Sequence, residues 1–344
     1  MRQSRIAGTG RFVPPNVLDS DQMAVFAGQP RGWNGEKIRR MTGIRERRFA
    51  VPLNTNTGLP LNPERDLGLV EIEMAVTAAR RALDDSGYEP EDVDTLIYVS
   101  CTAPHGGRAH FSANAHLIHK ELGVSHEADV YEMDAGCGGA VSAIGLATKL
   151  IGSEANNVVL IVASNQPSRY MDRELYKETG AWLSSLIFGD GAAATVIDGK
   201  ANGSGILGCV TETFSSLELM QLLEGETSRN RAYHILGKEV KEAFGTCLGG
   251  ILGKLFAKVP EARGAKMFIF HQVNERVLST FVDDYGLPKE RVPMHVATRG
   301  NIAAAATLDI LDEQRKSGKL KEGDLIVIGA VGAGAQVGAL AARL

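Results

Sequence analysis

Cys137 is the residue in this sequence whose surroundings best suit chemistry, because glycines flank it at a predicted strand-to-helix junction. The segment "EADVYEMD" before it alternates like a strand, and "GGAVSAIGLATKLIGS" after it repeats small and apolar residues at helical spacing. A thiol in the first turn of a helix meets unpaired backbone N–H groups and the positive end of the helix dipole, which favour a thiolate. Gly136, Gly138 and Gly139 leave space for a tight bend and for a substrate near the sulfur. The alternative is a buried cysteine that only packs as a small hydrophobe.

The elements that must position this thiol follow an order that occurs twice in the chain. Alternation of strands and helices predicts mostly parallel sheets covered by helices, and the repeated order predicts two similar α/β halves. We therefore predict an N-terminal half at 1–199, with the nucleophile, and a C-terminal half at 200–344. The predicted elements are a helix at 71–87, strands at 95–101 and 128–134, the helix after Cys137 and a strand at 157–165, followed by a helix at 238–259, a strand at 266–272, a helix at 302–318 and a strand at 324–331.

The repeated order supplies partners for the thiol. Cys137 and Asn301 take corresponding places, each after a strand and before a helix rich in small residues, and His271 ends the strand that corresponds to 95–101. Because α/β folds usually place their sites at the carboxyl ends of parallel strands, related halves would bring these residues toward one centre. His271 as a core histidine, and Asn301 as a turn or N-cap residue, remain the alternatives.

Composition limits the classes of function. A net charge of −4 and a pI near 6.1 argue against a dedicated nucleic-acid binder. The N-terminus lacks the apolar core of a signal peptide, and no apolar run has the length of a membrane span. The four cysteines are far apart and lack the spacing of metal ligands, so neither a zinc site nor a disulfide framework is expected. We expect a cytoplasmic, reduced protein that does not bind membranes.

Several motifs resemble, in order and over almost the whole chain, those of the β-ketoacyl-acyl-carrier-protein synthase III group of thiolase-like ketosynthases. The resemblance implies a thiolase-like fold of five layers, αβαβα, in which two similar α/β halves are related by a pseudo-twofold axis. The motifs are "MTGIRERRF" (41–49), "DAGCGGA" (134–140), "FGDGAAATVI" (188–197), "FHQVNERV" (270–277), "RGNIAAAA" (299–306) and "GAVGAGAQVGA" (329–339).

This resemblance implies that Cys137 is the nucleophile of an acyltransferase, with His271 and Asn301 as its catalytic partners. The backbone N–H groups of Cys137 and Gly334 would form the oxyanion hole. The implied reaction joins an acyl thioester to a malonyl or β-ketoacyl thioester by a Claisen-type condensation. A ketosynthase III that initiates fatty acids, or an acyltransferase that forms an ester or amide, are the alternatives. No metal or cofactor is implied, since the substrates are carried on phosphopantetheine of acyl carrier protein or coenzyme A.

The resemblance also implies a homodimer with acyl carrier protein as a partner. Phe111 takes the place of an aromatic residue that reaches into the partner's pocket, and Asp190 is expected to hold a turn. The remaining positions implied for substrate or carrier binding are Ala140, Gly237, Asn274, Arg276 and Arg40.

Two departures from the family pattern indicate a specialised enzyme. Ala140 stands where phenylalanine is common, so either the acyl tunnel is enlarged or the helix core is packed differently. Lys37 stands near the place of a tryptophan that stacks on the coenzyme A adenine, with Trp33 one helical turn earlier. Together with a basic cluster at residues 37–48, the second departure favours a carrier-bound donor. The departures as a whole favour longer, polyketide- or pyrone-type acyl groups.

Overall fold

Two β-sheets organise the described part of the chain in this computed structural model, which covers residues 2–26, 32–56, 61, 67–102, 114–170, 176, 182–224 and 231–344. The first sheet has the order β1-β7-β6-β4-β5, and the second has the order β11-β12-β13-β8. The strands of the first are β1 (Arg5–Phe12), β4 (Thr95–Val99), β5 (Asp129–Met133), β6 (Val158–Asn165) and β7 (Gly191–Asp198). Those of the second are β8 (Gly205–Thr213), β11 (Met267–Phe270), β12 (Leu325–Val331) and β13 (Gln336–Arg343). All strands of one sheet therefore precede residue 200, and all strands of the other follow it.

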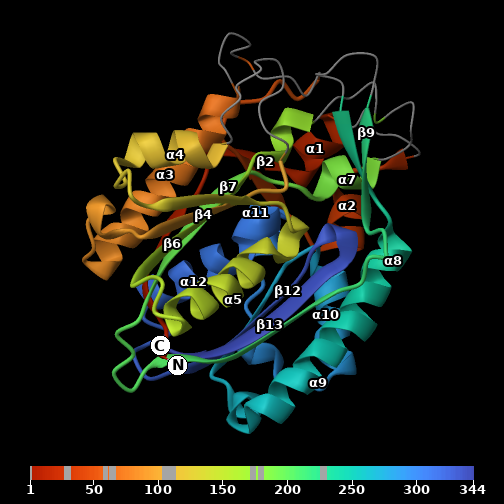
Figure 1. Cartoon of the computed structure of the whole chain (residues 1–344). Helices are drawn as coiled ribbons and strands as arrows, with labels where there is room; N and C mark the ends of the chain where they lie inside the picture. The colour runs from red at the N-terminus through yellow and green to blue at the C-terminus, as the bar shows by residue number, and fades with distance from the viewer. Residues whose placement is uncertain are drawn as a thin grey trace.

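Helices cover both faces of each sheet, which gives five layers (Figure 1). Helices α3 (Leu67–Ser86) and α4 (Asn114–Leu122) pack on the outer face of the first sheet. Helices α5 (Gly139–Gly152) and α12 (Ala306–Lys316) fill the space between the sheets. Helices α9 (Gly249–Lys258) and α10 (Glu275–Asp284) cover the second sheet from outside. The predicted αβαβα fold is confirmed.

Burial explains why the residues of α5 are small and apolar. This helix touches a sheet on both sides, so it has no broad face for charged side chains. Alanine and glycine along it also let the two sheets approach closely. The helix that carries the candidate nucleophile is therefore held on both sides.

The expectation of mostly parallel sheets is wrong, because strand directions are mixed. Strand β4 runs parallel to β5 and β6, and β11 runs parallel to β12. Strand β7 is antiparallel to β1 and β6, and β13 is antiparallel to β12 and β8. The turn at 332–335 between β12 and β13 is too short for the crossover that parallel neighbours need, so these strands must reverse direction.

Shorter elements gather above the ends of the strands that lead to the candidate site (Figure 1). The predicted helix at 238–259 is observed as α8 (Gly237–Glu242), a π-helical turn (Ala243–Leu248) and α9 in direct succession. In the described residues no helix combines the length and apolarity needed to cross a bilayer. The other short elements are β2 (Asn16–Asp19), α1 (Ser20–Phe26), α2 (Gly35–Thr42), β3 (Glu46–Phe49), α7 (Trp182–Ile187), β9 (Met220–Glu224), β10 (Arg231–Ile235) and α11 (Val296–Arg299).

Candidate active site

Cys137 lies in a 3₁₀ turn (Gly136–Gly138) that runs directly into α5. Gly136 has φ of 54°, in the left-handed region that glycine adopts most easily. A Cβ atom at this position would lie 2.4 Å from the backbone nitrogen of Ala333, so no other residue fits without displacement. The glycine before the cysteine is thus required by backbone packing at the start of the helix.

The structure brings the three predicted catalytic residues together around one pocket. Nε2 of His271 lies 3.3 Å from Oδ1 of Asn301, and the same oxygen accepts the backbone N–H of Ala303 at 2.9 Å. Because Oδ1 accepts the Ala303 N–H, the Nδ2 amide is the Asn301 group that can donate to a bound oxygen. The pocket is lined by Cys137, Phe188, Leu219, Met220, Ile235, Val240, Phe244, His271, Val273, Asn301, Val331 and Ala333.

The environment of Cys137 favours its thiolate. The pKa of this thiol is held well below 9, chiefly by its interaction with Cys101, and its interactions with His271 act in the same direction. These effects outweigh burial, which alone would raise the pKa. The pKa of Cys101 is raised well above 9 by its hydrogen bond with Cys137 and by its own burial. Of these two buried thiols, Cys137 is therefore the one whose thiolate is favoured.

Sequence reasoning missed Cys101 as part of the site. It follows β4, whose Val99 side chain reaches Gly139 at the start of α5. Its backbone is held from both sides, because its N–H donates to Asn165 Oδ1 at 2.7 Å and its carbonyl accepts from Tyr233 at 2.8 Å. The signal was present, since the strand that ends at this cysteine corresponds to the strand that ends at His271.

The predicted correspondence between Cys137 and Asn301 is shifted by three residues. Asp134 Oδ1 accepts the N–H of Gly136 at 3.4 Å, just as the Asn301 amide oxygen accepts that of Ala303 at 2.9 Å. Gly136 and Ala303, each the first residue of a 3₁₀ turn, have φ values of 54° and 49°. Asn301 therefore corresponds to Asp134, and Cys137 to Ala304. The two halves thus place their reactive residues at different positions of equivalent turns.

The glycine-rich turn at 332–335 packs backbone against backbone on the nucleophile turn. A Cβ at Gly332 would lie 2.3 Å from the Ala135 carbonyl oxygen, 2.6 Å from the Gly138 nitrogen and 3.2 Å from the Cys137 nitrogen. Gly334 in the same turn is left-handed, with φ of 84°. This contact is compatible with the predicted oxyanion hole, although the role of the Gly334 N–H group stays a prediction.

Comparison with known proteins agrees with this geometry. A family model for 3-oxoacyl-[acyl-carrier-protein] synthase III matches residues 131–214, and the model for its C-terminal part matches residues 261–344. The β-ketoacyl-[acyl-carrier-protein] synthase III of Coxiella burnetii is 28% identical over 350 residues, which cover 100% of both chains. The crystal structure of 3-oxoacyl-[acyl-carrier-protein] synthase III from Aquifex aeolicus has a TM-score of 0.80 and 26% identity, and the match covers 99% of this chain and 100% of that one. This chain is a β-ketoacyl-acyl-carrier-protein synthase III-like ketosynthase.

The thiolase-like fold also extends to synthases outside primary fatty-acid initiation. A priming β-ketosynthase from a polyketide biosynthetic pathway has a TM-score of 0.82 and 24% identity, with 100% of this chain and 96% of that chain covered. At that identity the likeness shows the fold alone. The family matches, not this neighbour, make the ketosynthase a condensing transferase.

The predicted substrate-binding residues of the ketosynthase are not all brought to the pocket. Ala140 is fully buried between the two sheets and does not line the pocket. Gly237 is the exposed first residue of α8, whose Val240 does line it. Asn274 caps α10, with its side chain accepting from the Val277 N–H at 2.9 Å. Phe111 lies outside the described residues.

The predicted basic cluster is only partly a surface feature. Arg47 is fully buried and does not belong to it. Arg39 pairs with Asp21 at 2.9 Å. Arg40 of α2 and Arg276 of α10 are both exposed, and Arg276 Nη1 donates to the Arg40 carbonyl at 3.4 Å. These last two arginines therefore lie together, beside the segment that continues from His271 into α10.

Asp190 has the structural environment expected for it. Its carboxylate accepts from the Ala50 N–H at 2.9 Å, from the Ser168 N–H at 3.0 Å and from the Ser168 hydroxyl at 2.7 Å. Burial raises the pKa of this carboxyl to about 7, although these hydrogen bonds act against the rise. The side chain thus joins its own turn to the segments around Ala50 and Ser168.

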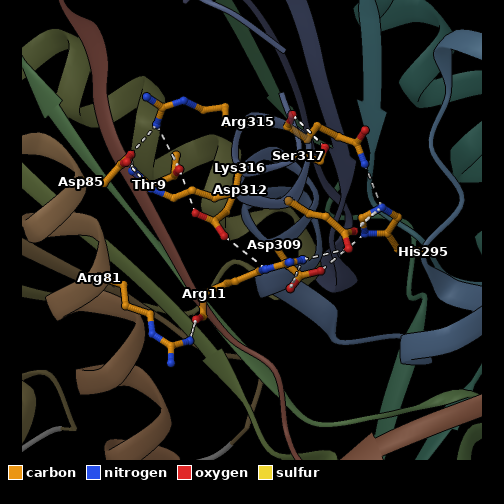
Figure 2. A network of polar contacts seen from close by, with 12 residues as sticks. Thr9, Arg11, Arg81, Asp85, His295, Asp309, Asp312, Arg315, Lys316 and Ser317 are labelled. Carbon is orange, nitrogen blue, oxygen red and sulfur yellow. Dashed lines mark hydrogen bonds and ion pairs between the residues drawn. The ribbon is translucent and has the colours of Figure 1, made fainter. Parts of the chain in front are cut away.

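A polar network anchors α12, the helix that follows Asn301, to the first sheet and to α3 (Figure 2). Arg11 of β1 lies 3.2 Å from the Asp312 carboxylate. Arg315 Nη1 donates to Asp85 of α3 at 2.9 Å. Because both contacts are partly or largely buried, they fix the helix more firmly than exposed ion pairs would.

The same network holds the segment that leads into Asn301. Arg299 donates to Asp309 at 3.2 Å and to Glu313 at 3.1 Å. Burial lowers the pKa of His295, but hydrogen bonds and charges from Asp309 and Glu313 outweigh it and raise this pKa above 6.5. The hydrogen bond from His295 in turn lowers the pKa of Glu313 to about 2. Hydrogen bonds and ion pairs therefore hold both the segment before Asn301 and the helix after it.

Proposed function

We propose that this ketosynthase carries an acyl group on Cys137 and transfers it to the α-carbon of a second thioester. The observation that carries the proposal is the meeting of a thiolate-favouring cysteine, His271 and Asn301 in one apolar pocket. In the first half-reaction the thiolate attacks the acyl carbonyl carbon and the donor leaves as a thiol. Two backbone N–H groups, those of Cys137 and Gly334, would stabilise the oxyanion, each worth roughly 3–4 kcal/mol.

In the second half-reaction, a malonyl thioester loses CO₂, or a β-ketoacyl thioester loses a proton, to form an enolate. The imidazole of His271 and the amide of Asn301 donate hydrogen bonds to the enolate oxygen. The α-carbon then attacks the acyl-cysteine carbonyl, the C–S bond breaks, and Cys137 is released with a new C–C bond in the product. These steps use no metal and no redox cofactor.

We further propose that the acyl groups are longer or more functionalised than those of a fatty-acid starter enzyme. This rests on an apolar pocket wall that suits alkyl groups. Ala140 no longer supports it directly, because its methyl group faces the core and not this pocket. A preference for acetyl or butyryl donors would instead make this a starter enzyme.

We propose acyl carrier protein as the preferred donor and a homodimer as the working form. The Lys37 ammonium group lies over the Trp33 ring, 4.9 Å from its centroid, so adenine stacking there would have to displace it. Exposed Arg40 and Arg276 present positive charge to an acidic carrier, which would raise the association rate at low salt. Light scattering after size exclusion tests the homodimer.

The test is a panel of acyl donors from acetyl to palmitoyl, on carrier protein and on coenzyme A. Intact-mass analysis reports acylation, and addition of malonyl thioester reports condensation through the mass of the released product. A β-keto thioester supports the proposal, and an ester or amide formed with a supplied alcohol or amine supports the alternative. Asn301→Ala should acylate normally and release β-keto product only at a small residual rate.

A further inference from the structure

Arg47 is a buried cation with no role in the reaction steps above. It belongs to β3, it is fully buried, and no ion pair joins it to a carboxylate among the described residues. Burial lowers the pKa of its guanidinium group to about 9, which leaves it charged at neutral pH. The charge of Asp19 opposes this lowering of the pKa but forms no ion pair with Arg47, and burying a charge is costly, so the hydrogen bonds of the guanidinium group show what it holds.

The guanidinium group is bound to the C-terminal end of α7. Nε of Arg47 donates to the Leu186 carbonyl at 2.9 Å, and Nη2 donates to the same oxygen. Nη1 donates to the Ser20 hydroxyl at 2.7 Å, and that hydroxyl donates to the Ile44 carbonyl at 2.7 Å. The last carbonyls of a helix lack partners within it, and a cation at that end also complements the helix dipole.

The next carbonyl of the same helix end holds Asn301. The N–H of Asn301 donates to the Ile187 carbonyl at 2.7 Å, and the Asn301 carbonyl accepts from Gly189 at 3.1 Å. Gly300 fits directly over Arg47, since a Cβ there would lie 3.0 Å from the arginine Cγ. One helix end is therefore shared by a buried cation and by the backbone of the predicted enolate-binding residue.

We propose that Arg47 is a positioning residue that fixes the Asn301 amide through the end of α7. The inference rests on the proposed condensation, because Asn301 serves that half-reaction. Without the guanidinium group, the Leu186 carbonyl loses both buried donors, and the residues that hold Asn301 move with it. A misplacement of about 1 Å at a catalytic group costs roughly 100-fold in rate.

The experiment compares Arg47→Met with Arg47→Lys, which keeps the charge but not the fork of donors. We expect Arg47→Met to acylate Cys137 within about threefold of the parent and to condense roughly 100-fold more slowly. Arg47→Lys should recover part of the loss. Arg5→Met is the control, because it also removes an arginine. Arg5 of β1 bonds to Asp198 of β7, and neither residue lines the pocket, so this variant should keep both half-reactions.

A double-variant cycle separates positioning from general loss of stability. On an Asn301→Ala background, Arg47→Met should add little to the condensation defect, whereas independent effects would multiply. The ¹⁵N resonances of the Asn301 side-chain amide, assigned by their loss in Asn301→Ala, should shift in both Arg47 variants and not in Arg5→Met. This readout remains available in Arg47→Lys should Arg47→Met fail to fold.

The outcomes distinguish this inference from the proposed function. A parent enzyme that acylates but never condenses contradicts the proposed function, while the amide resonances still test the positioning. A parent that condenses, an Asn301→Ala that condenses much more slowly, and Arg47 variants with parental condensation and unshifted amide resonances would overturn the inference alone. Multiplicative losses in the cycle would overturn it as well.

Discussion

Replacing Gly332 by alanine should separate the two turns on which the predicted oxyanion hole depends. Gly332 has extended backbone (φ −106°, ψ 156°), so alanine adds a methyl group without conformational strain. That methyl would lie 2.3 Å from the Ala135 carbonyl oxygen and 2.6 Å from the Gly138 nitrogen. Ordinary contact begins near 3.4 Å, so the nucleophile turn must retreat by about 1 Å.

Gly332→Ala is expected to slow acylation without unfolding the protein. Overpacking of this kind costs about 1–3 kcal/mol of stability, which a protein of this size tolerates. Moving one N–H donor away from the oxyanion costs about 100-fold or more in rate. The acylation of Cys137 in Gly332→Ala should therefore slow by roughly 100-fold while the protein remains folded.

Quenched-flow intact-mass analysis measures the acylation rate, and thermal unfolding measures the stability. Gly145→Ala is the control, because the same substitution in α5 would meet only the Cys209 sulfur, at 3.0 Å. It should acylate at the parental rate. A folded Gly332→Ala that acylates as fast as Gly145→Ala would refute the reasoning that the contact between these turns shapes the oxyanion hole.

Four further predictions follow from the same structure. Cys101→Ala should raise the pKa of Cys137, so the pH profile of iodoacetamide alkylation should move to higher pH; an unchanged profile would remove Cys101 from the site. Ala140→Phe should lower stability by about 1–3 kcal/mol in thermal unfolding through overpacking, whereas a stable variant with a shorter preferred acyl chain would restore Ala140 to the tunnel. Stabilisation by His295 is present below pH 6.5 and lost as pH rises through its raised folded pKa. The unfolding free energy of His295→Gln should therefore fall less between pH 6.5 and 8 than that of the parent. An equal fall in both proteins would contradict this. Arg276→Ala should lower kcat/KM for carrier-bound donors more than for coenzyme A donors and flatten the salt dependence; equal loss for both donors would argue against carrier docking.

Much of the fold was predictable because its signals are local. Helical spacing of small residues marks α5, and glycines mark the turn before it. The apolar runs at β4, β6 and β12 gave the buried strands of both halves. Strand direction was less accessible, since β7 and β13 read as apolar runs whatever their direction. Only the short turn at 332–335 requires an antiparallel partner strand, β13 beside β12. The alternation of strands and helices elsewhere in the chain favoured parallel strands.

The site was predictable where one residue type at one junction carries the chemistry, as with Cys137. Cys101 and Cys137 are 36 positions apart, so no helical or strand periodicity predicts that they meet. Arg47 was assigned to a surface cluster because it stands in a run of arginines. Yet it shares a face of β3 with Phe49, two residues on, and the burial of that phenylalanine was the available signal. Which charged residue of a run points inward depends on the packing partner, in this case the end of α7.

A pulse-chase measurement on Cys137 tests the central claim most directly. The ketosynthase is acylated once with an isotopically labelled acyl-carrier thioester, freed of donor, and then mixed with malonyl thioester. Peptide mapping before the chase should place the label on Cys137, and none should bind to Cys137→Ala. After the chase the label should leave the cysteine and appear in a β-keto thioester joined by a new C–C bond. A label that resides on another residue, or that leaves Cys137 only as free acid, ester or amide, would contradict the account.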